Sequence, residues 1–145
     1  MTDMQTVTLW PGMPEMSRIV YGCWRLADDP DTSPAAVAKK IGLCLDQGIT
    51  TFDHADIYGD YSCEALFGAA LAADRGLARD IRVVTKCGIM LESPVFPERR
   101  VKHYDTSAAH VRASAENSLK RLGVEVIDLM LVHRPDPFMD HRETA

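Results

Sequence analysis

Residues 114–133, SAENSLKRLGVEVIDLMLVH, join an amphipathic segment to a nearly unbroken apolar run. Apolar side chains recur here at helical spacing and predict a helix with one apolar face, made of Val111, Ala115, Leu119 and Leu122. Gly123 follows as the expected end of that helix. Residues 126–133 are apolar on both faces, which is typical of a strand buried in a parallel sheet.

The same order of a helix, a helix-ending glycine and a strand occurs twice earlier in the chain. Ser33 and Pro34 form a helix start, because a side-chain cap precedes proline at the first helical position. That helix is predicted to end at Gly48, and ITTFD (49–53) follows as a strand. Residues 61–76 predict a second helix that ends at Gly76, before the strand IRVVTK at 81–86.

The N-terminal region contributes two further strand patterns, at residues 5–10 and 17–22, which could form a small hairpin or begin a sheet. Strands that alternate with helices predict right-handed crossovers and a parallel α/β sheet. Two architectures fit this order: a doubly wound sheet, or part of a (β/α)₈ barrel. The 88–105 loop has two prolines, and a loop this long is typically functional or disordered.

Composition excludes several classes of protein. A chain of 145 residues with 46% hydrophobic and 26% charged side chains is typical of one globular domain. The net charge of −5 and the single basic cluster at 97–103, interpreted as a solvated loop, give nucleic-acid binding little support. We expect no membrane span and no secretory signal. The four cysteines form no CxxC pair, so we expect reduced thiols in a cytoplasmic protein.

Polar side chains stand at the carboxyl ends of the predicted strands, where parallel α/β proteins place their sites. These are residues 22–25 (GCWR), Asp53 with Tyr58 close behind, Lys86 and His133. An ammonium group beside a phenol stabilises the phenolate, an aspartate supplies the lysine's counter-charge, and a histidine can bind a substrate oxygen. The set predicts a phenol that exchanges a proton with a carbonyl or alcohol oxygen. It contains no strong nucleophile, so an external hydride donor, a cofactor, is implied.

A metal site is the competing interpretation of the polar residues that follow the second core strand. Asp53, His54, Asp56 and His133 offer oxygen and nitrogen ligands. Because strand side chains alternate, His54 points away from Asp53, so we expect no metal site. His54 is instead predicted to pack behind the strand, and Asp56 to be a loop or cap residue. Trp24 could lie in the core or line a carbonyl pocket, and both interpretations stay open.

Four segments now resemble a known family, the aldo-keto reductases, and in particular a bacterial oxidoreductase-like subgroup. FDHADIYG resembles the family motif in which an aspartate precedes a Tyr-Gly pair, and VVTKCG resembles its strand-terminal lysine. VYGCWRL resembles its first barrel strand, and SAENSLKRLGVEVIDLMLVHRPD resembles its longest signature. The resemblance runs from about residue 17 to 136 with the motifs in order, and it implies a TIM barrel with an N-terminal hairpin.

The resemblance implies the role of each site residue. The catalytic set would be Asp53, Tyr58, Lys86 and His133. Tyr58 would be the general acid, Lys86 would make its hydroxyl a stronger acid, and His133 would orient the carbonyl. Residues near the nicotinamide ribose of NADP(H) and the substrate would be Gly22, Cys23, Trp24 and Asp53. The chain departs from the family at His54 and Cys23, where threonine is common.

The other departure is length, since a complete barrel takes about 250 residues. Residues 1–145 are expected to form about four βα units, a truncated aldo-keto reductase domain equivalent to the first half of a barrel. The expected activity is NADPH-dependent reduction of a small aldehyde or ketone. The alternative is a non-catalytic half-barrel that self-associates through its open sheet edges.

Overall fold

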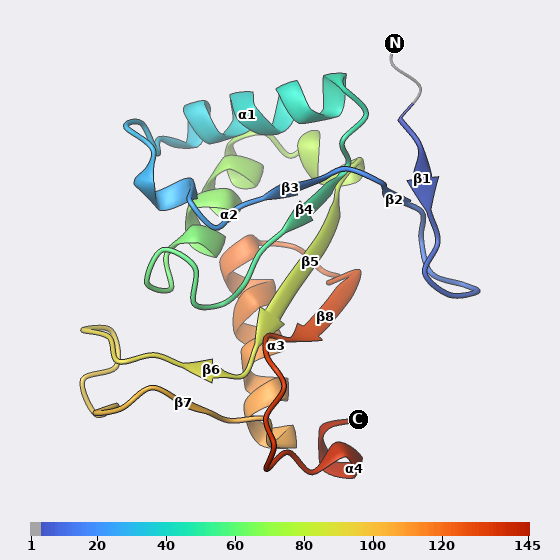
Figure 1. Cartoon of the computed structure of the whole chain (residues 1–145). Helices are drawn as coiled ribbons and strands as arrows, with labels where there is room; N and C mark the ends of the chain where they lie inside the picture. Colours follow the sequence, from blue (N-terminus) through green and yellow to red (C-terminus); the bar gives the residue numbers. More distant parts are fainter. Residues whose placement is uncertain (1–3) are drawn as a thin grey trace.

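A four-stranded parallel sheet forms the centre of the computed structural model, which describes residues 4–145 (Figure 1). Residues 1–3, part of the stretch predicted to lack a secretory signal, lie outside the described residues. The strand order is β3-β4-β5-β8, and its members are β3 (Val20–Gly22), β4 (Thr51–Asp53), β5 (Arg82–Cys87) and β8 (Leu129–Val132). The predicted parallel α/β sheet is therefore confirmed.

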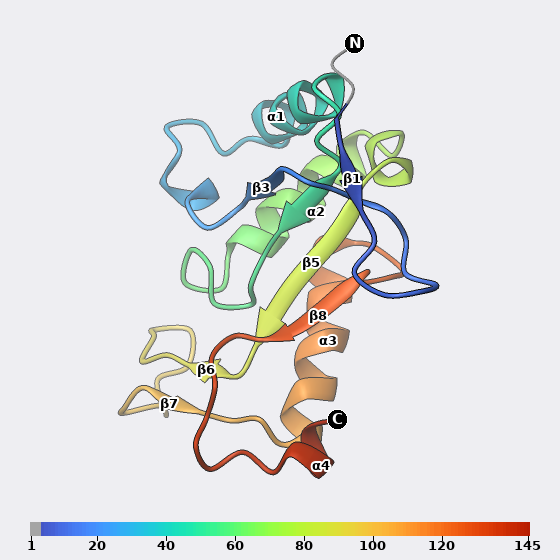
Figure 2. The same ribbon diagram turned by 45° about the vertical axis from the view of Figure 1, so that its right-hand side comes forward.

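Three helices connect the strands and lie on one side of the sheet, as Figures 1 and 2 show. They are α1 (Pro34–Asp46), α2 (Cys63–Ala73) and α3 (Ala108–Leu122). Two 3₁₀ turns, η1 (Leu26–Asp28) and η2 (Leu77–Arg79), and the short helix α4 (His141–Thr144) complete the helical elements of the described residues. The main core lies between this helical layer and the sheet, where Phe52 of β4 packs against Phe67 of α2 with ring centroids 5.2 Å apart.

The opposite face of the sheet carries a much smaller core. Val84 points to this face and packs with Met13, Met16 and Leu129, beside the N-terminal hairpin. That hairpin pairs β1 (Thr6–Val7) with β2 (Met16–Ser17) in antiparallel register, so the predicted hairpin is confirmed. The single strand expected at 17–22 is wrong, because the chain turns between β2 and β3, where the Ser17 hydroxyl donates to the Ile19 carbonyl over 2.7 Å.

The helix ends show where local sequence rules hold. Ser33 caps α1 by accepting from the Ala36 amide at 3.3 Å, and Gly123 ends α3 with a φ of 66°, both as predicted. The predicted end of the second helix at Gly76 is wrong, since α2 ends at Ala73. There Asp74 takes an extended conformation, and its carboxylate accepts from the Gly76 amide at 3.0 Å, a local turn that competes with the helix.

One prediction of burial is wrong, and the burial of α3 is uneven. The predicted apolar face of α3 is only half-buried at Val111, Ala115 and Leu119, while Ser114 and Ser118 are buried with Leu122. The reason is a close approach of α2, in which the Gly68 backbone lies against the Arg121 carbonyl. Strand β8 is half-exposed rather than buried, because within residues 4–145 it lies at the sheet edge and no strand pairs with its outer side.

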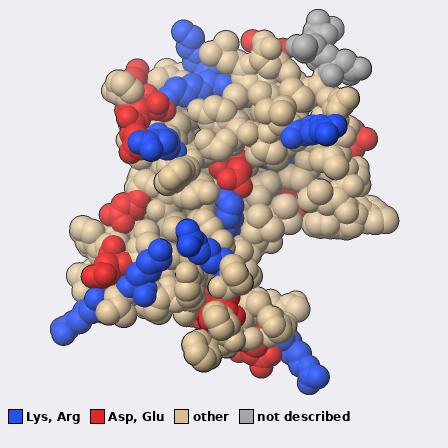
Figure 3. Space-filling model, viewed as in Figure 1, with Lys and Arg blue, Asp and Glu red and all other residues tan. Residues whose placement is uncertain are grey.

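The 88–105 segment contains secondary structure that the sequence did not predict. Strands β6 (Ile89–Met90) and β7 (His103–Tyr104) pair in antiparallel register and form a ribbon beyond the end of β5. Figure 3 shows basic side chains gathered with acidic ones over the region of the ribbon. Among the described residues, none of the helices has the length and apolarity that crossing a bilayer requires.

Candidate active site

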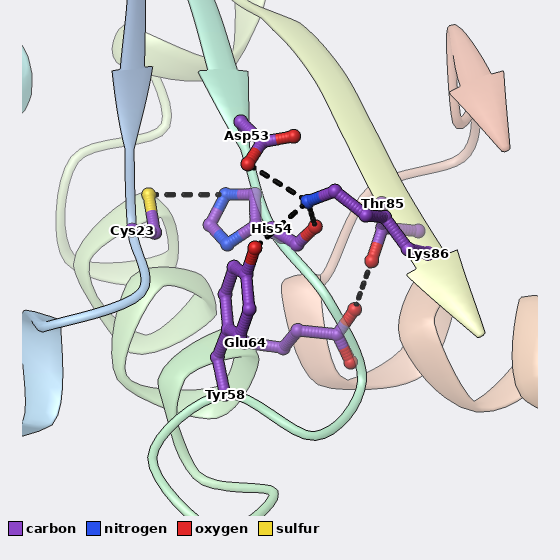
Figure 4. Close-up of polar contacts among 7 residues, drawn as sticks. All are labelled: Cys23, Asp53, His54, Tyr58, Glu64, Thr85 and Lys86. Carbon is purple, nitrogen blue, oxygen red and sulfur yellow. Dashed lines mark hydrogen bonds and ion pairs between the residues drawn. The ribbon is translucent and has the colours of Figure 1, made fainter. Parts of the chain in front are cut away.

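The carboxyl ends of β4 and β5 bring three of the predicted site residues into direct contact (Figure 4). The Lys86 ammonium donates to Asp53 Oδ2 over 2.8 Å and to the Tyr58 hydroxyl oxygen over 3.0 Å. Its third partner is the backbone carbonyl of His54, at 2.6 Å. A lysine ammonium has three N–H donors, so all of them are satisfied and the charge is held in one position.

The sheet register explains this contact. Asp53 of β4 lies opposite Val84 of β5, and Lys86 stands two residues further along the same face of β5. The lysine side chain is 14% exposed, so its interaction with Asp53 is only weakly screened by water. Because the Tyr58 oxygen accepts from Lys86, its own hydrogen is available to an acceptor outside the protein.

His133 completes the set at the end of β8. Its ring meets the Tyr58 ring edge-on, with centroids 5.8 Å apart and planes at 78°. Its backbone amide donates to the Cys87 carbonyl over 2.8 Å, which fixes the residue to β5. Burial lowers the pKa of His133, and the Lys86 and Arg134 charges lower it further, so the ring is neutral near pH 7. A neutral imidazole has one N–H to donate to a substrate oxygen.

The turn after Tyr58 is conformationally unusual. Gly59, Asp60 and Tyr61 all have a positive φ, at 58°, 51° and 69°. A Cβ at Gly59 would lie 2.6 Å from Cys63 Sγ and 2.7 Å from Ala27 Cβ, so only glycine fits there. Left-handed backbone at two non-glycine residues is uncommon and gathers at functional turns. This turn follows Tyr58 directly and leads the chain into α2.

His54 lies behind the strand, as predicted. It is fully buried, its Nε2 is 3.6 Å from Cys23 Sγ, and its ring packs edge-on against Phe67 with centroids 4.5 Å apart. Burial lowers the pKa of His54 to about 3, with a smaller effect from the Lys86 charge, so the ring is neutral. Within residues 4–145 there is no group of three or more His, Cys, Asp or Glu side chains placed to hold a metal ion.

The residues predicted to lie near the cofactor separate into two groups. Trp24 is 65% exposed and lines a cavity of about 350 Å³ together with Tyr58 and His133, which we call the Tyr58 cleft. The structure therefore places Trp24 in the pocket and not in the core. Gly22 is exposed beside Asp53 in the sheet. The Cys23 side chain is buried and turned toward His54, so its position gives no support to a side-chain contact with a cofactor.

Sequence reasoning missed several residues of this cleft and of the layer behind it. Lys102 and Arg134 line the cleft, and no acidic side chain of residues 4–145 does. Behind the site, the buried Glu64 accepts from the Thr85 hydroxyl at 2.7 Å and from Arg121 at 3.4 Å. The length of the 88–105 segment was a usable signal for Lys102. Nothing in the sequence around Glu64 indicated a buried carboxylate.

Comparison with known proteins connects this geometry to a family. A family model described as "Aldo/keto reductase family" matches residues 18–145. A 6-dehydroglucose reductase of Agrobacterium fabrum is 55% identical over 131 residues, which are 90% of this chain and 44% of that protein. The oxidoreductase YdhF of Escherichia coli is 45% identical over 98% of this chain and 47% of its own length.

Solved structures give the same result for the fold. The holo form of the aldo-keto reductase AKR11C1 from Bacillus halodurans superposes with a TM-score of 0.77 at 27% identity, over 97% of this chain and 44% of that one. The glycerol dehydrogenase AKR11B4 from Gluconobacter oxydans has a TM-score of 0.76 at 31% identity, over 96% and 42%. The chain thus spans less than half the length of these relatives and forms part of a barrel.

Proposed function

Because the chain belongs to the aldo/keto reductase family, we propose that its site reduces small aldehyde or ketone carbonyls with NADPH, and that Tyr58 is the general acid. The observation that carries this proposal is the Lys86 ammonium held between Asp53 and the Tyr58 hydroxyl. The chain spans 44% of the Agrobacterium relative, so cofactor binding and turnover by residues 1–145 are themselves part of the proposal.

The proposed proton transfer follows from the contacts at Tyr58. A carbonyl oxygen in the Tyr58 cleft accepts the phenolic hydrogen, because the phenolic oxygen already accepts from Lys86. As the proton leaves, negative charge develops on Tyr58, and the ammonium 3.0 Å away stabilises it. Asp53 holds the ammonium in position through its contact of 2.8 Å. The neutral His133 ring donates its N–H to the same carbonyl oxygen and orients it.

A nicotinamide cofactor fits the described part of the site. The exposed Trp24 ring at the Tyr58 cleft offers a flat surface to a heteroaromatic ring, and none of the described residues gives the cleft an acidic lining that would repel phosphates. When bound, NADPH supplies the hydride that a tyrosine cannot. The relatives are named for a dehydrogenated sugar and for glycerol, which favours a small hydroxylated carbonyl compound as substrate. The four free cysteines accord with the cytoplasm as the proposed location.

NADPH binding and turnover test this proposal. NADPH should quench tryptophan fluorescence, and Trp24→Phe should remove most of the quenching while Trp10→Phe, in the hairpin region, should keep it. Tyr58→Phe should abolish aldehyde reduction and leave quenching in place, because only the transferable proton is lost. Removal of a general acid costs about 10²–10⁴-fold in rate. Quenching that does not saturate at millimolar NADPH would rule out the proposal for this chain.

A second candidate function, a self-associating half-barrel, is favoured by the exposed sheet edges. Leu131 of β8 is 37% exposed at one edge, and Val20 of β3 is exposed at the other. Unpaired strand edges are templates for pairing with another chain. Such an assembly would bury these strand edges, and Tyr58 would have no catalytic role in it.

A further inference from the structure

A second cavity of about 220 Å³ lies beside the proposed active site, between α3 and the segment that carries β6. One face of α3 supplies His110, Ser114, Asn117 and Arg121, and the other walls include Asp56 and Arg99. We call this the Asp56 cavity. It shares one lining residue, Ile89, with the Tyr58 cleft, and it contains none of the proposed catalytic residues.

The guanidinium of Arg99 carries a charge that no carboxylate of residues 4–145 neutralises by a salt bridge. It donates to the Tyr61 hydroxyl over 2.8 Å and lies 3.6 Å above the Phe96 ring. Both partners are uncharged. They hold the Arg99 side chain in place at the cavity without neutralising its positive charge. Arg99 belongs to the basic cluster interpreted above as a solvated loop, and the structure half-buries it instead.

Among residues 4–145, Asp56 is the only acidic residue that lines the cavity, and it is 6% exposed. Its Oδ2 accepts from the Ser114 hydroxyl at 3.4 Å, and its Oδ1 is buried with no partner among the described residues. Burial raises the pKa of Asp56 to about 7, the nearby Glu64 raises it too, and Arg121 opposes them. Below pH 7 the group is therefore a protonated donor.

The other titratable groups around Asp56 do not cancel this effect. Glu64 of α2 is already paired with Arg121, and His110 of α3 is kept neutral because burial lowers its pKa. Cys87 of β5 is also neutral, since burial raises its pKa to about 11. With Asp56 protonated, the polar part of the lining is rich in donors and carries excess positive charge, and a buried carboxyl oxygen lacks a partner among the described residues.

We propose that the Asp56 cavity binds a compact oxyanion, which accepts from Arg99, Asn117 and Arg121 beside the Asp56 carboxyl. Carboxylate, phosphate and sulfate groups share this chemistry, because each accepts several hydrogen bonds from guanidinium and amide donors. The proposal does not depend on the proposed function, since no residue of the catalytic set takes part.

Sulfate is the probe, because its charge is constant between about pH 5 and 9. Titration at constant ionic strength, followed by amide NMR, should give saturable shifts at Asn117 and at residues around Asp56 at pH 6. Ionised Asp56 repels the anion, so the affinity should fall at least about tenfold by pH 8.5. Asp56→Asn should retain at pH 8.5 the affinity that the natural chain shows at pH 6.

Arg99→Met should remove the saturable shifts, and Arg100→Met is its matched control, because it deletes the neighbouring exposed charge. The natural affinity should be kept in Arg100→Met and in Tyr58→Phe, which separates this site from catalysis. The NMR spectrum of each variant reports whether it is folded. Equal shifts with chloride would show a non-specific salt effect, and the same sulfate response in Arg99→Met would show that sulfate does not bind at Arg99 in this cavity. Either result would overturn the proposal.

Discussion

Lys86 shows how much of a site can be predicted at the level of single residues. Its pairing with Asp53 and Tyr58 follows from residue types at the ends of adjacent parallel strands, and the structure brings the three together. Its third acceptor, the His54 carbonyl, could not be predicted, because a backbone group has no sequence signature. The position of that carbonyl depends on the packing of the His54 side chain in the core, so His54 contributes to the site indirectly.

The buried His54 ring makes stability depend on pH. The folded state keeps the ring neutral down to about pH 3, whereas the unfolded chain protonates it near its usual pKa of 6.5. Its contribution is thus present above pH 6.5 and is lost as pH falls toward 3, with a slope of at most about 1.4 kcal/mol per pH unit. Urea unfolding of the natural chain from pH 7.5 to 4.5 should show this loss.

His54→Thr should lose less stability over the same range, since its side chain does not titrate. Other groups contribute equally to both curves, so the difference between them isolates the ring. His141→Asn, at an exposed position in α4, is the control and should follow the natural curve. Parallel curves for the natural chain and His54→Thr would contradict the assignment of a buried neutral histidine.

At the level of elements, the contact between α2 and α3 depends on Gly68. A Cβ built there would lie 2.0 Å from the Arg121 carbonyl oxygen and 2.9 Å from the Leu122 carbonyl carbon. This approach explains why the small side chains of Ser114 and Ser118, and not the larger apolar residues of α3, are buried. Helical periodicity predicted the helix correctly but not which face is buried, because that depends on the neighbouring element.

Gly68→Ala should therefore destabilise the fold, although alanine is the better helix former. The α3 backbone must move to admit the methyl group, and overpacking of this kind costs about 1–3 kcal/mol. Gly42→Ala in α1 is the matched control, because nothing lies within 4 Å of its Cβ. The free energy of unfolding of that variant should rise by roughly 0.8–1.0 kcal/mol, because alanine has the higher helix propensity. Urea midpoints at constant m-value measure both, and equal shifts would contradict the packing argument.

At the scale of the whole molecule, the described sheet has two open edges and one thinly covered face. The helices cover one side, while the other side carries a small cluster around Val84. Val111 and Ala115 of α3 and Met130 of β8 line an open groove beside the edge strand. In a complete barrel these surfaces would meet further strands and helices. In residues 4–145 they are exposed, and they are the surfaces at which we propose that two copies of the chain associate.

Self-association through the β8 edge should be visible in sedimentation velocity as a concentration-dependent increase in mean mass. Leu131→Lys should reduce it, because an edge lysine opposes strand pairing. Val101→Lys, which adds the same charge at an exposed loop position, should leave it unchanged. A chain that stays monomeric at all concentrations, or equal effects of the two lysines, would contradict association through this edge.

Periodicity and local chemistry in the sequence were enough for the parallel sheet, the caps at Ser33 and Gly123, and the contact set of Asp53, Tyr58 and Lys86. The two caps depend on neighbours a few residues away. The sheet and the contact set depend on alternation along strands and on the rule that adjacent parallel strands end at the same edge of a sheet. Other features depend on packing between segments far apart in the chain. Gly68 meets α3 across such a distance, and Asp56 is buried against Ser114 with its pKa raised. Burial is a property of the assembled neighbours, so only the folded arrangement sets the charge of Asp56.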